Sequence, residues 1–212
     1  MQLYSFFNSS TSYRVRIALA LKGLPFEYMP VDIRKGAHRD PGYVAHNPSA
    51  NVPLLVDGDV ELGQSLAIID YLDAKYPQAR LIPQDPLERA RALEFAYAIA
   101  CDIHPVNNLR ILKYLVGELK VSEEQKNTWY AHWIAEGMSA VERLLERHGK
   151  GPYVFGDAPT VADCCLVPQV ANALRMKCDL SPYPRAMAVF EHCQAQDAFK
   201  QAAPSAQPDF NA

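Results

Sequence analysis

Four consecutive hydroxyl residues, Ser9 to Ser12, stand between a short apolar run and a segment with helical periodicity. The first N–H groups of a helix have no intrahelical partner, so these groups and nearby hydroxyls can donate hydrogen bonds to an anion. A lone cluster of this kind more often serves only as the helix cap. From the residues alone, Ser9, Ser10 and Thr11 therefore have two interpretations, a cap or a site that stabilises an anion.

The elements that would position this cluster follow from the pattern of apolar residues. We expect a strand over 3–7, a helix over 14–22 that stops at Gly23, and a second strand over 26–31. A β-α-β unit of this kind should have parallel strands and a right-handed crossover. The hydroxyl cluster would then lie at the strand-to-helix junction.

A second group of short elements follows. Residues 32–48 are polar and irregular in pattern, and the Asp-Gly pair at 57–58 lies between two apolar runs, which predicts a hairpin. A further helix is expected to begin at Gln64 and Ser65. The order β-α-β and then β-β-α predicts an α/β domain, which we place at residues 1–80.

The pattern changes beyond this domain. Residues 81–86 hold two prolines in mostly polar sequence and are predicted to be an interdomain linker. The rest of the chain is helical in pattern, which predicts an all-α domain over 87–212. Its helices are expected over 87–104, 106–116, 123–148, from 160 onward, and 185–199. Residues 203–212 are predicted to be loosely held.

Composition narrows the class of protein. Of 212 residues, 49% are hydrophobic and 21% charged, with a net charge of −3 and no long basic run, which argues against nucleic acid or an anionic membrane as a partner. No apolar run approaches the roughly 20 residues of a membrane span, and no secretory signal is visible, so we expect a cytoplasmic protein. The five cysteines are odd in number and lack CxxC spacing, so they predict neither a disulfide framework nor a metal site.

The motifs together resemble the glutathione transferase family. The stretch SSTSYRVRIALALKG at 9–23 is similar to the zeta-class signature SSCxWRVRIAL. ValPro at 52–53 resembles the cis-proline turn of a thioredoxin-like domain, GlnSer at 64–65 the pair that binds the glutamyl end of glutathione, and TVAD at 160–163 a buried helix cap. Further similar stretches are QSLAIIDYL, LIPQDP, ADCCLVPQVANA and DLSPYP, so the resemblance covers almost the entire chain.

This resemblance implies a fold, a cofactor and a reaction. The fold would be an N-terminal thioredoxin-like domain followed by a C-terminal helical bundle, assembled as a homodimer. The reaction would be the glutathione-dependent cis–trans isomerisation of maleylacetoacetate to fumarylacetoacetate, or of maleylpyruvate to fumarylpyruvate. A thiolate would add to the double bond, permit rotation about the resulting single bond, and leave again.

The resemblance also implies which residues hold glutathione. Ser9 is the first choice as hydrogen-bond donor to the thiolate, with Ser10 and Thr11 beside it. The other expected glutathione contacts are Val52, Pro53, Gln64, Ser65, His38, Asn51, His104, Asn107 and Asn108.

A dianionic substrate would need cations near the sulfur. Arg110 and Arg175 match family positions close to the active site, and a guanidinium suits a carboxylate. Arg14 and Arg16 are alternatives, with a structural ion pair favoured for Arg16. Asn8 departs from the family pattern, which commonly has arginine immediately before the two serines. We expect Asn8 to lie at the substrate, and the missing positive charge leaves open which dicarboxylate binds.

Two other functions stay open at this point. A broader transferase acting on haloacids or peroxides would use the same thiolate without needing Arg110 and Arg175. An interaction module with this fold and no catalysis is the third possibility. The joint presence of four residues argues against it, namely Ser9, Pro53, Gln64 and Ser65.

Overall fold

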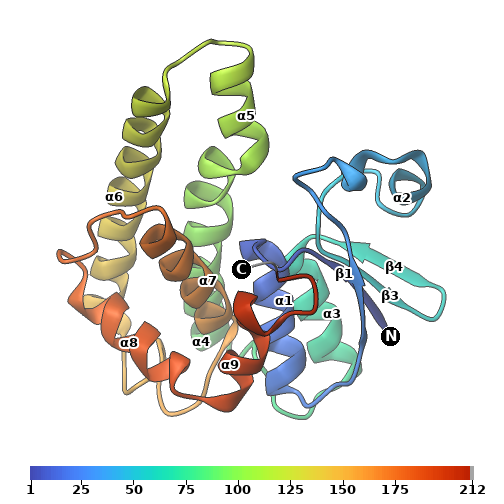
Figure 1. The fold of residues 1–212 in the computed structure, drawn as a ribbon. Helices are drawn as coiled ribbons and strands as arrows, with labels where there is room; N and C mark the ends of the chain where they lie inside the picture. Colours follow the sequence, from blue (N-terminus) through green and yellow to red (C-terminus); the bar gives the residue numbers. More distant parts are fainter. Residues whose placement is uncertain (211–212) are drawn as a thin grey trace. The chain divides into compact units, whose positions relative to one another are not determined.

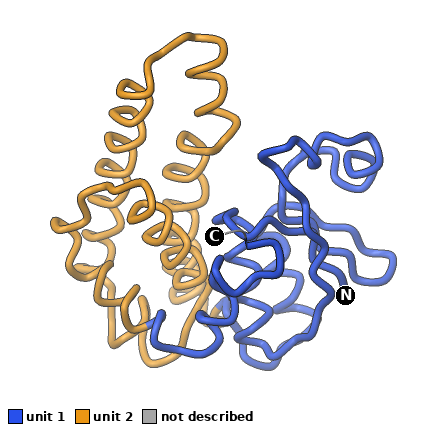
Figure 2. Tube along the Cα trace, viewed as in Figure 1, with its two compact units in different colours: residues 1–82, 193–212 blue, residues 83–192 orange. Residues whose placement is uncertain are grey.

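Residues 1–210 are described by a computed structural model, in which the chain divides into two units. Unit 1 consists of residues 1–82 together with 193–212, and unit 2 consists of residues 83–192 (Figure 2). The sequence had assigned the whole of 87–212 to one helical domain. The structure differs at the end of the chain because helix α9 (Asp197–Ala202) packs on helix α1 (Ser10–Leu21) of unit 1.

Unit 1 is built on a four-stranded sheet with the order β2-β1-β3-β4 (Figure 1). The strands are β1 (Gln2–Ser5), β2 (Glu27–Pro30), β3 (Leu54–Asp57) and β4 (Val60–Gly63). The predicted parallel pairing of the first two strands is confirmed, and β3 runs antiparallel to both of its neighbours. The predicted hairpin is also confirmed, with Gly58 at a φ of +64° in its turn.

Helix α1 begins four residues earlier than its apolar pattern indicated, because Ser9 caps it. The Ser9 Oγ accepts the Ser12 N–H at 3.2 Å. At the other end, Gly23 has a φ of +63°, and the N–H of Leu24 bonds to the Leu19 carbonyl at 3.0 Å. This is the Schellman arrangement in which a glycine ends a helix, as predicted for Gly23.

Helix α1 and helix α3 (Ser65–Lys75) bury their apolar sides against the sheet. The core between them combines residues of β1, α1, β3 and α3, namely Leu3, Val15, Leu19, Leu55, Ile68 and Leu72. All six are fully buried. Their close packing therefore fixes the positions of both helices, and of their N-terminal ends, relative to the sheet.

The segment 32–48 is more ordered than its polar pattern suggested. It contains a short 3₁₀ helix, η1 (Ala37–Arg39), and a helix α2 (Pro41–His46) that begins with proline at its first position. Both are too short for apolar periodicity to reveal them.

Unit 2 consists of helices and short helical turns. They are α4 (Pro86–Tyr97), the π-helix η2 (Ala98–Ile103), η3 (Pro105–Asn107), α5 (Leu109–Gly117), α6 (Glu123–His148), α7 (Val161–Arg175) and most of α8 (Pro184–Gln194). The predicted bounds of α6 match those observed, and the capping box of Thr160 and Asp163 at the start of α7 is confirmed. Burial raises the pKa of Asp163 to about 6, although its carboxylate accepts backbone N–H bonds from Val154 and Thr160.

The first long helix of unit 2 departs from a regular α-helix before the proline expected to divide it. Its last turn is the π-helix η2, and a Cβ at Gly137 of α6 would lie only 2.2 Å from Ile103 Cγ1. The glycine therefore lets η2 lie close against α6. π-Helical turns often occur at functional sites, and His104 follows directly.

The end of the chain is also more ordered than predicted. The single helix expected over 185–199 is two helices, α8 and α9, and the segment 203–210 folds back onto unit 1. Gln207 is buried, and its amide donates to the Gln201 and Ala203 carbonyls at 2.9 Å each. The prediction of a loosely held tail is therefore wrong for 203–210, because this segment has specific buried partners, while 211–212 lie outside the described residues.

The predicted linker likewise begins inside unit 1. Leu81 and Ile82 are buried, and their N–H groups donate to the Asp73 carboxylate at 2.9 and 2.6 Å. The same carboxylate forms an ion pair with Lys22 at 2.7 Å. Among the described residues, no helix combines the length and the hydrophobicity that a membrane crossing requires.

Candidate functional site

The hydroxyl cluster predicted at the start of α1 lies beside the Val52–Pro53 turn. The Ser9 and Thr11 hydroxyl oxygens are 2.9 Å apart, and the Thr11 hydroxyl donates to the Val52 carbonyl at 2.9 Å. The Val52–Pro53 peptide bond is cis, as expected. Three of the predicted site residues therefore form one continuous set of hydrogen bonds within unit 1.

The direction of these bonds fixes the role of the Ser9 hydroxyl. A hydroxyl has one hydrogen, and that of Thr11 is used on the Val52 carbonyl, so in the Ser9–Thr11 contact Ser9 is the donor. The Ser9 oxygen at the same time accepts the Ser12 N–H. Rotation about its Cβ–Oγ bond could turn this hydrogen toward a ligand atom at the end of α1, at the cost of about one neutral hydrogen bond, roughly 1 kcal/mol.

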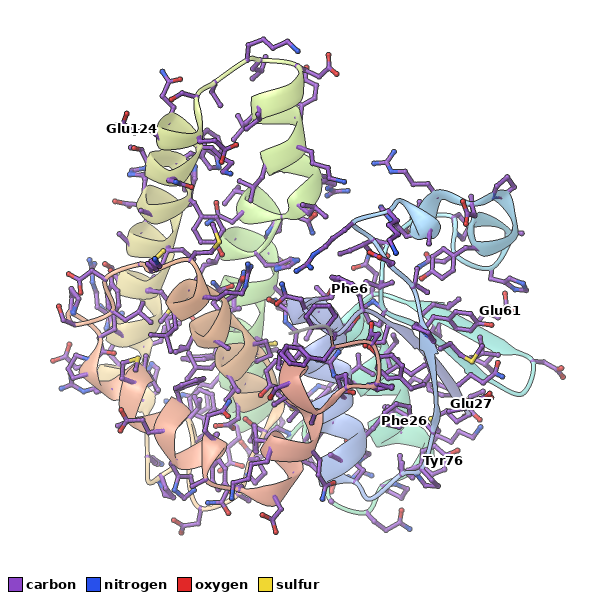
Figure 3. The ribbon with its side chains drawn as sticks, viewed as in Figure 1. Phe6, Phe26, Glu27, Glu61, Tyr76 and Glu124 are labelled. Carbon is purple, nitrogen blue, oxygen red and sulfur yellow. The ribbon has the colours of Figure 1, made fainter. Side chains whose placement is uncertain are left out.

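A tight turn over residues 6–9 places Ser9. The Ser9 N–H bonds to the Phe6 carbonyl at 3.0 Å, and Phe6 itself follows β1 (Figure 3). Arg16, which is 1% exposed, donates to the Phe6 carbonyl at 3.3 Å and to the Phe7 carbonyl at 2.9 Å. Arg16 therefore fixes the backbone of this turn by hydrogen bonds to two of its carbonyl oxygens.

Arg16 is buried, which supports the structural role favoured from the sequence over contact with a substrate. Its other contacts are the Ala202 carbonyl at 2.9 Å and the Ser5 hydroxyl at 3.0 Å, and no carboxylate among the described residues lies within ion-pair distance of it. Burial lowers its pKa to about 10, so it keeps its charge at neutral pH. Its role is structural, but its partners are carbonyl and hydroxyl oxygens.

Arg14 and Ser65 form a second cluster within unit 1. The Arg14 side chain is 2% exposed, and its Nη1 donates to the Ser65 hydroxyl at 3.3 Å. Its Nε and Nη2 are buried and have no hydrogen-bond partner among the described residues. A buried guanidinium with unmatched donors at the N-terminal end of α3 is suited to receive an anion. Gln64, which precedes this helix, is exposed and has a φ of +64°.

The remaining predicted residues of unit 1 surround the Val52 turn. The Asn51 carbonyl accepts from the Asn47 amide at 2.7 Å and from the Tyr43 hydroxyl, so the turn is tied to α2. His38 lies in η1, next to Ala37, which packs against the apolar cluster containing Val52.

Asn8 lies in the turn before Ser9 and is partly buried, and Ser10 is buried. A cation that the sequence did not single out lies close by, since the Arg34 guanidinium carbon is 5.3 Å from the ring centroids of both Phe6 and Phe7. The structure therefore places a positive charge against the two aromatic rings that precede Asn8 in the sequence.

The predicted residues of unit 2 gather around the end of the π-helix. The His104 Nε2 lies 3.2 Å from the Asn108 amide nitrogen, and the Asn108 side chain caps α5 by accepting the Arg110 N–H at 3.1 Å. Asn107 is buried, and its amide donates to the Tyr130 carbonyl at 3.1 Å, while its Oδ1 has no partner among the described residues.

Tyr130 of α6 connects this group to Arg175. The Tyr130 hydroxyl accepts from the Asn172 amide at 2.7 Å, and the Asn172 carbonyl oxygen accepts from Arg175. Burial raises the pKa of Tyr130, so its hydroxyl stays neutral. Arg175 and Arg110 are both exposed and come from different helices, α7 and α5.

Sequence reasoning missed Tyr130 and Asn172. Tyr130 has the signal of a core position, because it is buried on the inner side of α6. Only the position of Asn172, three residues before Arg175 on one helix, could have drawn attention to it.

The sequence profiles of one family match both parts of the chain. The profile described as "Glutathione S-transferase, N-terminal domain" matches residues 1–74, and that described as "Glutathione S-transferase, C-terminal domain" matches 127–192. The first range contains Ser9, Val52 and Ser65, and the second contains Arg175.

Individual relatives are similar over nearly the full length. The maleylpyruvate isomerase of a Ralstonia species is 48% identical, over 99% of both chains. The solved holo structure of a maleylpyruvate isomerase, a bacterial glutathione S-transferase of the zeta class, has a TM-score of 0.97 at 47% identity, with 100% of both chains covered.

A third relative carries ligands. The maleylacetoacetate isomerase of Anaeromyxobacter dehalogenans 2CP-1 was solved with dicarboxyethyl glutathione and citrate in its active site. It has a TM-score of 0.87 at 38% identity, with 98% of this chain and 92% of that chain covered. Together with the family profiles, these likenesses establish that the chain belongs to the glutathione transferase family and, within it, to the zeta class.

Proposed function

We propose that this chain is a glutathione-dependent cis–trans isomerase that converts maleylacetoacetate to fumarylacetoacetate, or maleylpyruvate to fumarylpyruvate. The observation that carries the proposal is the Ser9 hydroxyl at the N-terminal end of α1, linked through Thr11 to the Val52 carbonyl. Relatives with full-length similarity bear the names of these two isomerases.

Glutathione suits the polar groups of unit 1. The buried donors of Arg14 beside Ser65 would receive its γ-glutamyl carboxylate, and the backbone of Val52 would pair with its extended cysteinyl residue. Bound glutathione would supply the thiolate that adds to the cis double bond, so that the bond can rotate before the thiolate leaves. Ser9 and the free N–H groups of α1 would hold the sulfur as an anion before attack.

Replacing Arg14 by methionine tests the carboxylate site. Arg14→Met keeps an apolar side chain of similar length but removes the buried donors, so the Kd for glutathione should rise about tenfold or more. Titration calorimetry with glutathione and with cysteinylglycine, which lacks the γ-glutamyl group, provides the control. An equal loss of affinity for both ligands would contradict a contact with the glutamyl carboxylate.

The substrate arginines are proposed from unit 2. Arg175 is exposed and is held by Asn172, so a guanidinium is available for a carboxylate of the substrate, with Arg110 as the second. Arg175→Ala should raise KM for the dicarboxylate about tenfold and leave KM for glutathione within about twofold. Arg143→Ala, which removes an exposed arginine of α6, is the matched control. An equal loss with neutral electrophiles would exclude a carboxylate contact.

An ultraviolet assay of the purified protein decides between the functions. Maleylacetoacetate and maleylpyruvate are supplied with and without glutathione, and isomerisation that requires the tripeptide supports the proposal. Release of halide from a chlorinated acid, with neither isomerisation detectable, would favour the broader transferase. Absence of both activities in protein that still binds glutathione would favour the interaction module.

Several further features belong to the same proposal. Glutathione binding is assigned to unit 1 and substrate binding to unit 2, in a cytoplasmic homodimer. Dimer formation is supported by Leu87 and Tyr97 of α4, which are 58% and 47% exposed. Light scattering of the eluted protein measures its molar mass and tests this point.

A further inference from the structure

The end of the chain binds the turn that presents Ser9. We propose that Asp209 is a positioning residue for the Ser9 hydroxyl, because it anchors the 6–9 turn from the C-terminal segment. This inference rests on the proposed role of Ser9. It concerns a residue 200 positions away in the sequence, in a segment that was expected to be loosely held.

Both carboxylate oxygens of Asp209 are used within unit 1. Oδ2 accepts the Phe7 N–H at 3.0 Å, and Oδ1 accepts the Tyr28 hydroxyl at 2.6 Å. The Phe7 and Phe210 rings meet edge to face at 5.5 Å between centroids. The C-terminal segment therefore contacts both the backbone N–H and the ring of Phe7. The Tyr28 contact attaches the same segment to β2.

The Asp209 contact completes the hydrogen bonding of the turn. The Phe6 carbonyl accepts from Ser9 and Arg16, the Phe7 carbonyl accepts from Arg16, and the Phe7 N–H donates to Asp209. Without Asp209, the peptide between Phe6 and Phe7 loses its partner on the nitrogen side. A partly buried N–H without its acceptor favours a shift of the backbone, and Ser9 is only two residues further along.

Burial and charge are consistent with a fixed arrangement. The α9 end that precedes the segment is held by Arg16 through the Ala202 carbonyl, and Gln207 is buried against Gln201 and Ala203. The anionic Asp209 also balances part of the charge of the buried Arg16 guanidinium. Arg16 thus binds two carbonyl oxygens of the turn, and Asp209 binds one of its N–H groups.

The two variants Asp209→Ala and Asp209→Asn separate position from charge. Both remove the negative charge, but asparagine keeps an acceptor for the Phe7 N–H and an amide that can donate to the Tyr28 oxygen. Loss of a nearby negative charge alone would stabilise a thiolate and lower the pKa of the bound thiol in both variants. Loss of position would raise that pKa in Asp209→Ala only.

The measurement is the pH titration of the thiolate ultraviolet absorbance of glutathione bound to the full chain, together with kcat. We expect about a tenfold loss of kcat at neutral pH and a higher thiol pKa in Asp209→Ala, with Asp209→Asn within about twofold of the unaltered protein. Asp197→Ala, at a carboxylate 90% exposed on α9, is the control. If Asp209→Ala does not fold, Tyr28→Phe removes one contact to the carboxylate and should shift the pKa in the same direction by less.

Opposite outcomes are distinguishable. Equal shifts in the alanine and asparagine variants, or a lowered pKa in Asp209→Ala, would overturn the positioning role. An unaltered thiol pKa in Asp209→Ala and in Tyr28→Phe would do the same. If even the unaltered protein leaves the pKa of bound glutathione at the value of the free tripeptide, the proposed function itself fails.

Discussion

Replacing Ser9 by alanine is expected to lower kcat about a hundredfold, the cost typical of removing one preorganised donor to an anion. The Kd for glutathione should stay within about threefold, because most of the tripeptide would contact other residues. The acid limb of the pH–rate profile should move to higher pH, because the thiol pKa returns toward its usual value of about 8.5. Steady-state kinetics between weakly acidic and alkaline pH measure both effects.

Two further variants separate the hydroxyl from the helix cap. Ser9→Ala also removes the cap that accepts the Ser12 N–H, at a cost of about 1 kcal/mol in stability. Ser122→Ala removes the equivalent cap of α6 and should lower stability by a similar amount with kcat unchanged. Ser9→Thr keeps a hydroxyl and a cap and should recover much of the rate. An unaltered pH profile in Ser9→Ala would remove Ser9 from the reaction.

The largest loss of stability is expected from Asp73→Ala. The Lys22 and Asp73 side chains are 1% and 4% exposed, and the carboxylate also accepts the N–H groups of Leu81 and Ile82. The substitution leaves the two N–H groups buried without their acceptor and removes the counter-charge of an ammonium group that keeps, among the described residues, only the Gln78 and Ala79 carbonyls, so the free energy of unfolding should fall by about 3–5 kcal/mol. Urea unfolding followed by circular dichroism measures the change.

The order of three variants tests this explanation. Lys22→Met should cost less than Asp73→Ala, because the carboxylate that it leaves behind keeps its two backbone donors. Asp59→Ala, at an exposed position of the β3–β4 hairpin, should change stability by no more than about 0.5 kcal/mol. A loss for Asp73→Ala no greater than that for Asp59→Ala would mean that the ion pair contributes nothing to the fold.

Elements with strong local signals could be predicted from the sequence. The Gly23 helix end, the turn at Gly58 and the capping box of Thr160 each depend on residues within a few positions, and all three are present in the structure. The hydroxyl cluster could also be recognised from consecutive residues. The Val52 turn was predicted from the resemblance of the motifs to the family.

Contacts between distant residues could not be predicted. The Phe7–Asp209 bond spans 202 positions, and the connection of Tyr130 to Asn172 spans 42. No spacing rule covers such pairs, since they depend on how whole elements pack. The unmatched donors of Arg14 are a similar case, because only the burial of the side chain distinguishes it from an exposed arginine.

The shared membership of residues 1–82 and 193–212 in unit 1 has a consequence for biosynthesis. Domains usually fold in order from the N-terminus as they leave the ribosome. Here the carboxylate that accepts the Phe7 N–H lies 202 positions further along the chain, so this contact can form only after unit 2 has been translated. Ribosome-bound chains that stop before residue 193 should therefore hold unit 1 in an incomplete, protease-sensitive form.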